Sequence, residues 1–242
     1  MADGSAPYVA DNLLDRRSRT ATLEQHYRHM QARERRLLAG RLPLAGGDVL
    51  SVGCGWHPGR HLFPAPAFRI VAADADPAKV AGVLQERRAD EALVGQAGSL
   101  ALEPGSFDVV LYRLVLHHIA FQGPLRPCFQ EAARLLRPGG ALVAVEPGLW
   151  HPVGAALALA NRTGVATRVH GTPDDIPLSP RTLTALAREA GLAPELHAVT
   201  YTWRRMAPWL QRALAPVDEL GSRPAAARFG HTLMLIARRS AG

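Results

Sequence analysis

Short apolar runs recur along the chain and predict the strands of a buried sheet. Most of these runs are continuous rather than alternating with polar residues, which is typical of parallel strands covered on both faces. The predicted strands span residues 49–52, 68–73, 92–94, 107–112, 141–145, 197–203 and 231–237. Asp74 directly follows the second of them and Glu146 directly follows the fifth.

Segments with helical spacing or helix-start signals separate these strands. The first is an amphipathic helix over residues 20–40, with Leu23, Tyr27, Met30, Leu37 and Leu38 on its apolar stripe. Proline is tolerated in the first turn of a helix, so Pro77 and Pro180 mark two helix starts, and Pro138-Gly139-Gly140 marks a helix end. The predicted helices span residues 20–40, 77–88, 124–137, 150–161 and 180–191, with a loop over residues 163–180. The alternation of strand and helix predicts an α/β fold with a parallel sheet.

The composition fits one soluble domain. The chain has 242 residues, of which 48% are hydrophobic and 20% are charged, so it is long enough for one well-buried core and too apolar for general disorder. The longest apolar stretch, residues 153–160, is too short to span a membrane, and residues 1–10 lack the pattern of a signal peptide. Cys54 and Cys128 provide neither a disulfide framework nor a zinc set. We therefore expect a cytoplasmic protein without a membrane span.

The net charge of +7 comes almost wholly from arginine, because Lys79 is the only lysine among 28 basic residues. A basic chain permits a nucleic-acid partner. The arginines are spread along the whole sequence rather than gathered in one tract, which favours a solvated surface instead.

A glycine-rich turn follows the first predicted strand. In a doubly wound sheet this turn approaches the ligand most closely, at the carboxyl ends of the strands. Gly53 and Gly55 occupy it, and Asp74 ends the second strand 19 positions after Gly55, where a carboxylate can accept hydrogen bonds from both hydroxyls of a ribose. The third glycine of a dinucleotide fingerprint would be residue 58, which is Pro58 here, and this disfavours a nicotinamide oxidoreductase.

Five segments together resemble the class I S-adenosylmethionine-dependent methyltransferases. They are the strand and turn at residues 49–55, the acidic segment at residues 73–77, and the runs at residues 105–110, 114–119 and 131–140. The resemblance implies a Rossmann-like, doubly wound, seven-stranded, mostly parallel sheet whose last strand is antiparallel. It also implies a single domain over residues 1–242, in which residues 1–40 form an N-terminal helical lid, residues 41–147 the cofactor-binding half, and residues 148–242 the substrate-side half with an inserted helix and loop.

The same resemblance assigns roles in binding S-adenosyl-L-methionine. The main chain around Gly53, Cys54 and Gly55 would approach the methionine and ribose, and Asp74 would hold the ribose hydroxyls. The complete predicted cofactor set is Ser51, Gly53, Cys54, Gly55, Asp74, Ala75, Gln96, Ala97, Gly98, Ser99, Arg113 and Leu114. Gln96, Ala97, Gly98 and Ser99 would flank the adenine, and Arg113 and Leu114 would pass beside the methionine and the sulfonium. We expect Asp76 to cap the following helix rather than to touch the cofactor.

Three positions depart from the pattern of the family. Ser51 stands where many relatives have Asp or Glu, which weakens the expected hold on the cofactor amine. Gln96 replaces a common Asp, although its amide can still pair with a base edge. Trp56-His57-Pro58 places bulky residues after the glycine turn, where small residues are usual.

Transfer of a methyl group to a hydroxyl requires a base to take the proton. His117 and His118 lie just beyond the fourth strand, at the edge of the sheet where the ligand is expected, and Glu146 ends the fifth strand on the same edge. We predict these three as the catalytic residues. Adjacent residues point in different directions, so one histidine would face the substrate while the other packs or caps a turn. Glu146 could instead cap a helix that begins near residues 148–150.

The expected function is methylation of a small organic acceptor. Substrate-side segments rich in aromatic and apolar residues favour an apolar pocket, and O-methylation in secondary or lipid-like metabolism, as in natural product biosynthesis, is the leading hypothesis. A tRNA or other nucleic-acid methyltransferase and a non-catalytic module that binds the cofactor remain alternatives. We predict no metal. His170 and the carboxylates of Asp174 and Asp175 lie close together in the sequence, but the sequence does not show a further ligand that would converge with the imidazole and a carboxylate. A homodimer is left open.

Overall fold

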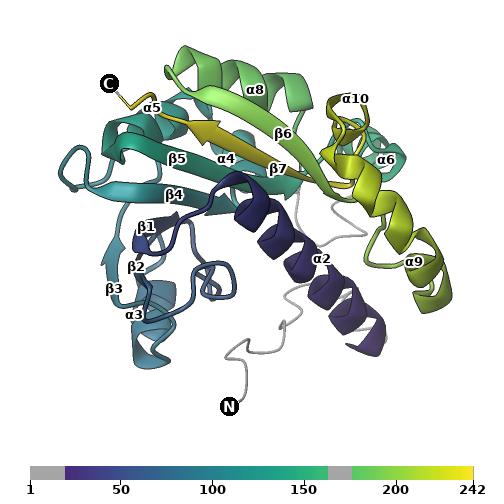
Figure 1. Ribbon diagram of the computed structural model, residues 1–242, viewed down its shortest axis with the longest axis horizontal. Helices are drawn as coiled ribbons and strands as arrows, with labels where there is room; N and C mark the ends of the chain where they lie inside the picture. Colours follow the sequence, from purple (N-terminus) through teal and green to yellow (C-terminus); the bar gives the residue numbers. More distant parts are fainter. Residues whose placement is uncertain (1–19, 163–175, 242) are drawn as a thin grey trace.

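The computed structural model describes residues 20–162 and 176–241, and within them a seven-stranded sheet (Figure 1). The strands are β1 (Gly47–Val52), β2 (Phe68–Asp74), β3 (Glu91–Val94), β4 (Phe107–Arg113), β5 (Leu136–Pro147), β6 (Ala193–Thr200) and β7 (Thr232–Arg238). Their order is β3-β2-β1-β4-β5-β7-β6. The pairs β3–β2, β2–β1, β1–β4 and β4–β5 are parallel. β7 lies between β5 and β6 and pairs antiparallel with both. The predicted fold class, including the antiparallel last strand, is confirmed.

Helices connect and cover these strands. They are α2 (Thr20–Arg41), α3 (Pro77–Gln85), α4 (Leu116–Gln122), α5 (Arg126–Leu135), α6 (Pro152–Arg162), α8 (Pro180–Glu189), α9 (Pro208–Leu214), the 3₁₀ helix η1 (Ala215–Ser222) and α10 (Pro224–Ala227). Asp76 accepts a 2.9 Å hydrogen bond from the backbone N–H of Ala78 and so caps α3, as predicted.

Alternate side chains of each strand enter two separate cores. Val49 of β1 packs on one side of the sheet with apolar residues of α2 and α3, whereas its neighbour Leu50 packs on the other side with those of α5 and α8. Figure 1 shows α2 passing in front of the sheet toward α9. Leu23, Tyr27, Met30, Leu37 and Leu38 of α2 are all buried in the first core. Residues 20–40 are therefore part of the folded body, and their action as a lid stays a prediction.

Several predicted boundaries differ from the observed elements, and two of these differences change how a segment is interpreted. The helix expected over residues 124–137 ends at Leu135, and Pro138-Gly139-Gly140 lies inside β5. This run does not break the strand, because the ladder shifts register opposite it, between Phe107 and Val109. The strand expected over residues 197–203 ends at Thr200, the last residue paired with β7. Most of the predicted loop over residues 163–180, with His170, Asp174 and Asp175, lies outside the described residues.

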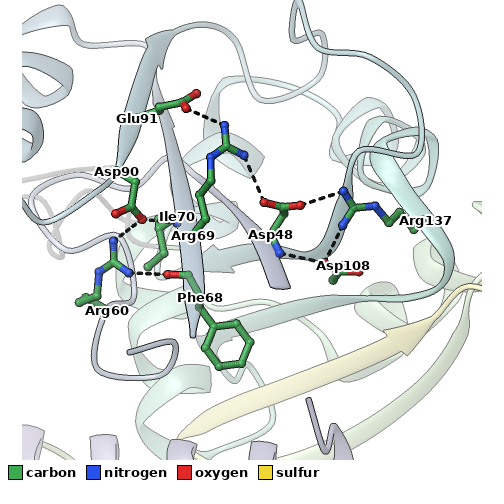
Figure 2. Close-up of polar contacts among 9 residues, drawn as sticks. All are labelled: Asp48, Arg60, Phe68, Arg69, Ile70, Asp90, Glu91, Asp108 and Arg137. Atoms are coloured by element: carbon green, nitrogen blue, oxygen red, sulfur yellow. Dashed lines mark hydrogen bonds and ion pairs between the residues drawn. The ribbon is translucent and has the colours of Figure 1, made fainter. Parts of the chain in front are cut away.

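Charged residues alternate along the amino ends of the strands, on the edge opposite the glycine turn (Figure 2). Arg69 of β2 bonds Glu91 of β3 at 2.7 Å and Asp48 of β1 at 3.2 Å. Arg137 of β5 in turn bonds Asp48 at 2.8 Å and Asp108 of β4 at 2.6 Å. This charge ladder ties the starts of five strands together and lies away from the candidate site.

Candidate active site

The glycine turn lies where the strand order reverses, between β1 and β4. Gly53 and Gly55 both have left-handed backbone, with φ of +60° and +51°. A Cβ on Gly53 would lie 2.2 Å from Cγ2 of Val115, so side-chain packing excludes one there. Nothing lies within 4 Å of a Cβ built on Gly55. The main chain at Gly55 therefore borders open space, as a ligand that lies against the turn requires.

Asp74 braces this turn from the end of β2. The residue is 7% exposed, and its carboxylate accepts a 2.9 Å hydrogen bond from the N–H of Gly55 on Oδ2 and a 3.0 Å bond from the N–H of Asp76 on Oδ1. A carboxylate oxygen has two lone-pair sites. Each oxygen of Asp74 can thus accept a further hydrogen bond from a sugar hydroxyl, the role predicted for it.

The other predicted cofactor residues follow the same edge of the sheet. Ala75 is exposed directly after β2, and residues 96–99 form a turn after β3, closed by a 3.0 Å bond from the N–H of Ser99 to the carbonyl of Gln96. Ser51 is buried within β1. Cys54 is also buried, which raises the pKa of its thiol to about 12, so the thiol is neutral and a poor nucleophile. The ends of β1, β2 and β3 thus bring these predicted residues side by side.

The turn after β4 lies next to the glycine turn, on the side of β1 away from β2 and β3. Leu114 has a φ of +56°, which is unusual for a residue with a side chain and costs about 1 kcal/mol or more. Its N–H donates a 2.8 Å bond to the carbonyl of Val145. Strain of this kind persists only where neighbouring contacts fix the backbone.

Glu146 fixes the far side of that turn. Its side chain is fully buried, and Oε1 accepts hydrogen bonds from the N–H groups of Val115 at 3.0 Å and Leu116 at 2.8 Å. Oε2 lies 2.6 Å from Nδ1 of His117. Glu146 therefore caps α4, rather than a helix near residues 148–150, and a carboxylate is favourable at that helix end.

The two adjacent histidines have different environments. His117 is 5% exposed and bonds Glu146, whereas the ring of His118 lies tilted against it with centroids 4.0 Å apart. A carboxylate accepts only, so Nδ1 of His117 carries the proton in this contact, and the basic lone pair is then on Nε2. His117 thus has a buried carboxylate partner that orients its ring, as a general base needs.

A second buried carboxylate lies near this turn and was not predicted from the sequence. Glu34 of α2 is fully buried and accepts bonds of 3.2 Å from both Nε and Nη2 of Arg113 and one of 2.8 Å from Nε2 of His61. Burial by itself raises the pKa of Glu34, but Arg113 and then His61 more than offset this, and the pKa lies below its usual value. Burial lowers the pKa of His61, although the hydrogen bond with Glu34 acts to raise it. The group therefore consists of a carboxylate, a guanidinium and a neutral imidazole.

Among residues 20–162 and 176–241, no three His, Cys, Asp or Glu side chains are arranged to hold a metal ion. In the same part of the chain, no helix has the length and apolar character needed to cross a membrane.

The sequence model of a family described as a methyltransferase domain matches residues 50–144. The match runs from β1 to β5, so it includes the glycine turn, Asp74 and the histidine pair. Glu34 and Glu146 lie outside it. Residues 50–144 of the chain are thus similar to a methyltransferase domain.

Two curated relatives share part of this sequence. A probable S-adenosylmethionine-dependent methyltransferase of Mycolicibacterium smegmatis is 35% identical over 103 residues, which are 43% of this chain and 39% of the relative. An uncharacterized 37.1 kDa protein of transposon Tn4556 from Streptomyces fradiae is 36% identical over 113 residues, 42% of this chain and 30% of the relative. The matches span less than two fifths of each relative's length.

Solved structures share the fold at low sequence identity. A Thermotoga maritima protein described as an S-adenosylmethionine-dependent methyltransferase, possible histamine N-methyltransferase, gives a TM-score of 0.62 at 17% identity and covers 88% of this chain and 91% of its own. A Haemonchus contortus phosphoethanolamine N-methyltransferase, solved with S-adenosyl-L-methionine, gives 0.59 at 16% identity over 96% of this chain and 60% of its own.

Proposed function

We propose that this chain, whose residues 50–144 match the model of a methyltransferase domain, transfers a methyl group from S-adenosyl-L-methionine to a small organic acceptor. The observation that carries the proposal is the glycine turn, whose main chain at Gly55 borders open space while Asp74 braces it from the neighbouring strand. This arrangement fits a nucleoside with a bulky, charged substituent. The domain match supports the same cofactor.

The residues that would hold the cofactor lie at the ends of four adjacent strands. The main chain of residues 53–55 would contact the methionine and ribose, Asp74 the ribose hydroxyls, residues 96–99 the adenine, and residues 113–114 the methionine portion. When bound, S-adenosyl-L-methionine supplies a methyl group already activated by its sulfonium. The protein then has to align the acceptor and exclude water.

The contact between His117 and Glu146 supports a hydroxyl acceptor, and hence O-methylation. Nε2 of His117 would take the hydroxyl proton as the oxygen attacks. Glu146 would hold the ring by its Nδ1–H and stabilise the imidazolium that forms, from 2.6 Å away. The acceptor would come from secondary or lipid-like metabolism, as in natural product biosynthesis.

The buried thiols of Cys54 and Cys128 fit a reducing cytoplasm, which we propose as the compartment. We also propose the division into a cofactor-binding half at residues 41–147 and a substrate-side half at residues 148–242. We propose a small molecule as the partner, and size-exclusion chromatography tests for a homodimer.

Calorimetry tests the cofactor directly. We expect the full chain to bind S-adenosyl-L-methionine and not NADH; the reverse result would contradict the proposal. A screen with labelled methyl donor against metabolites, tRNA and DNA then identifies the acceptor. Label recovered on the oxygen of a small molecule supports O-methylation, and label recovered only on nucleic acid contradicts it.

A further inference from the structure

Two fully buried carboxylates on opposite sides hold the turn after β4. Glu146 of β5 binds the main chain of residues 115–116 and the ring of His117, while Glu34 of α2 binds the side chain of Arg113. The proposed reaction uses Glu146. It leaves the buried charge of Glu34 without a role.

Arg113 is placed close to where the cofactor would lie. It ends β4, which pairs with β1 in a register that joins Val52 to Tyr112, so Arg113 stands beside Gly53, the first residue of the glycine turn. Its side chain is only 11% exposed. Water therefore screens the guanidinium charge weakly, and charges several ångströms away respond to it.

A buried guanidinium at this position would oppose the proposed cofactor, because S-adenosyl-L-methionine carries a positive sulfonium. Glu34 bonds two nitrogens of that guanidinium, and the pKa of Glu34 lies below its usual value. Its charge therefore offsets that of Arg113. The pKa of His61, the third member of the group, is lowered by burial, which keeps its ring neutral. The whole group then has a net charge near zero.

We propose that Glu34 is a positioning residue of the cofactor site, which neutralises Arg113 and so permits a cationic sulfonium to bind beside it. The inference rests on the proposed function. It gives α2 a part in cofactor selection that is separate from its packing, because the helix supplies the counter-charge for a side chain of β4. S-adenosylhomocysteine, the product, lacks the sulfonium charge, and its affinity should depend little on Glu34.

The test compares the dissociation constants of S-adenosyl-L-methionine and S-adenosylhomocysteine, measured by calorimetry on the full chain. Glu34→Gln keeps the shape of the side chain and removes its charge. We expect about a tenfold loss of affinity for S-adenosyl-L-methionine relative to S-adenosylhomocysteine, because the guanidinium is then uncompensated in a low-dielectric site. The double variant Glu34→Gln/Arg113→Gln, which removes both charges, should restore the wild-type ratio.

Glu195→Gln is the matched control. Glu195 of β6 also pairs with an arginine of α2, Arg41 at 2.8 Å, but both of these side chains are more than a third exposed. We expect the ratio of the two dissociation constants to stay at its wild-type value in this variant. Thermal unfolding of each variant shows whether it is folded.

The outcomes separate the two claims. A wild-type chain that binds neither compound overturns the proposed function, and the inference with it. A wild-type chain that binds both, with Glu34→Gln weakening both equally or neither, overturns the inference alone. Should Glu34→Gln fail to fold, Arg113→Gln carries the test: with the cation removed, the preference for S-adenosyl-L-methionine should hold or rise, and a fall overturns the inference.

Discussion

Nδ1 of His117 lies 2.6 Å from Oε2 of Glu146, and the same carboxylate accepts two backbone N–H groups at the start of α4. Local backbone bonds thus fix Glu146 independently of the histidine. The imidazole of His117 is thus oriented by a carboxylate that the backbone fixes in place, which is the geometry of an oriented general base.

Glu146→Gln should lower kcat about 100-fold with little change in cofactor affinity. The amide of Gln can donate to Nδ1 of His117, which favours the tautomer whose Nε2 carries the proton and no longer accepts one. Single-turnover kinetics and calorimetry measure the two quantities. Unchanged turnover with unchanged cofactor binding would remove Glu146 from the mechanism.

Substituting each of the two histidines in turn should show which one affects kcat. His117→Asn should lower kcat by about 100-fold or more, because its ring bonds the buried carboxylate of Glu146. On the proposal that His117 is the base, His118→Asn should change kcat by less than about tenfold. The measurement is kcat with the identified acceptor. A larger effect of His118→Asn would assign the base to His118.

The two glycines of the turn should also respond differently. Gly53→Ala should lower the free energy of unfolding by more than about 1 kcal/mol, since its Cβ would meet Val115 at 2.2 Å and its φ is positive. Gly55→Ala should cost only about 1 kcal/mol for its backbone conformation but weaken cofactor binding, because its methyl would enter the open space. Urea unfolding and calorimetry give both values. Full cofactor affinity in Gly55→Ala would argue against the proposed binding mode.

Stability should fall in mild acid through His26. Burial, followed by the nearby charge of Arg204, lowers the pKa of His26 to about 4. The unfolded chain therefore binds a proton below pH 6.5 that the folded chain does not, so the free energy of unfolding decreases from pH 6.5 downward, by about 3 kcal/mol at pH 4.

His26→Phe isolates this contribution. Nδ1 of His26 has no hydrogen-bond partner among the described residues, so an apolar ring of similar size should be tolerated at pH 7. Urea unfolding between pH 7 and pH 4 should show a shallower loss in the variant than in the wild type. Equal slopes would mean that other groups cause the acid sensitivity.

The sequence predicted the elements whose signals are local. The continuous apolar runs gave every strand of the described sheet, and Asp76 before Pro77 gave a correct cap. Pro138-Gly139-Gly140 was predicted only to end a helix, because proline and glycine disfavour regular structure locally. Pairing of β5 with β4 and β7 instead keeps this run within a strand. α4 was missed because its seven residues are too few to show a helical period.

The candidate site was predicted in outline. Glu146 and the histidines were placed by the rule that parallel strands end at one edge, but which histidine contacts Glu146 depends on side-chain directions that no pattern gives. Glu34 could have been found: it lies four residues after Met30 and three before Leu37, on the apolar stripe of α2, where a charged residue needs a buried partner. Its partner, Arg113, is 79 residues away and is brought close only by the fold.

The charge ladder has a consequence for choosing solution conditions. Its members Asp48, Asp108 and Arg137 are more than a quarter exposed, so dissolved ions reach them and weaken their attraction. The carboxylates of Glu34 and Glu146 are sealed from those ions on the opposite edge. Ionic strength therefore acts on the two edges of the sheet unequally, weakening the charge ladder before it affects the buried carboxylates of the candidate site.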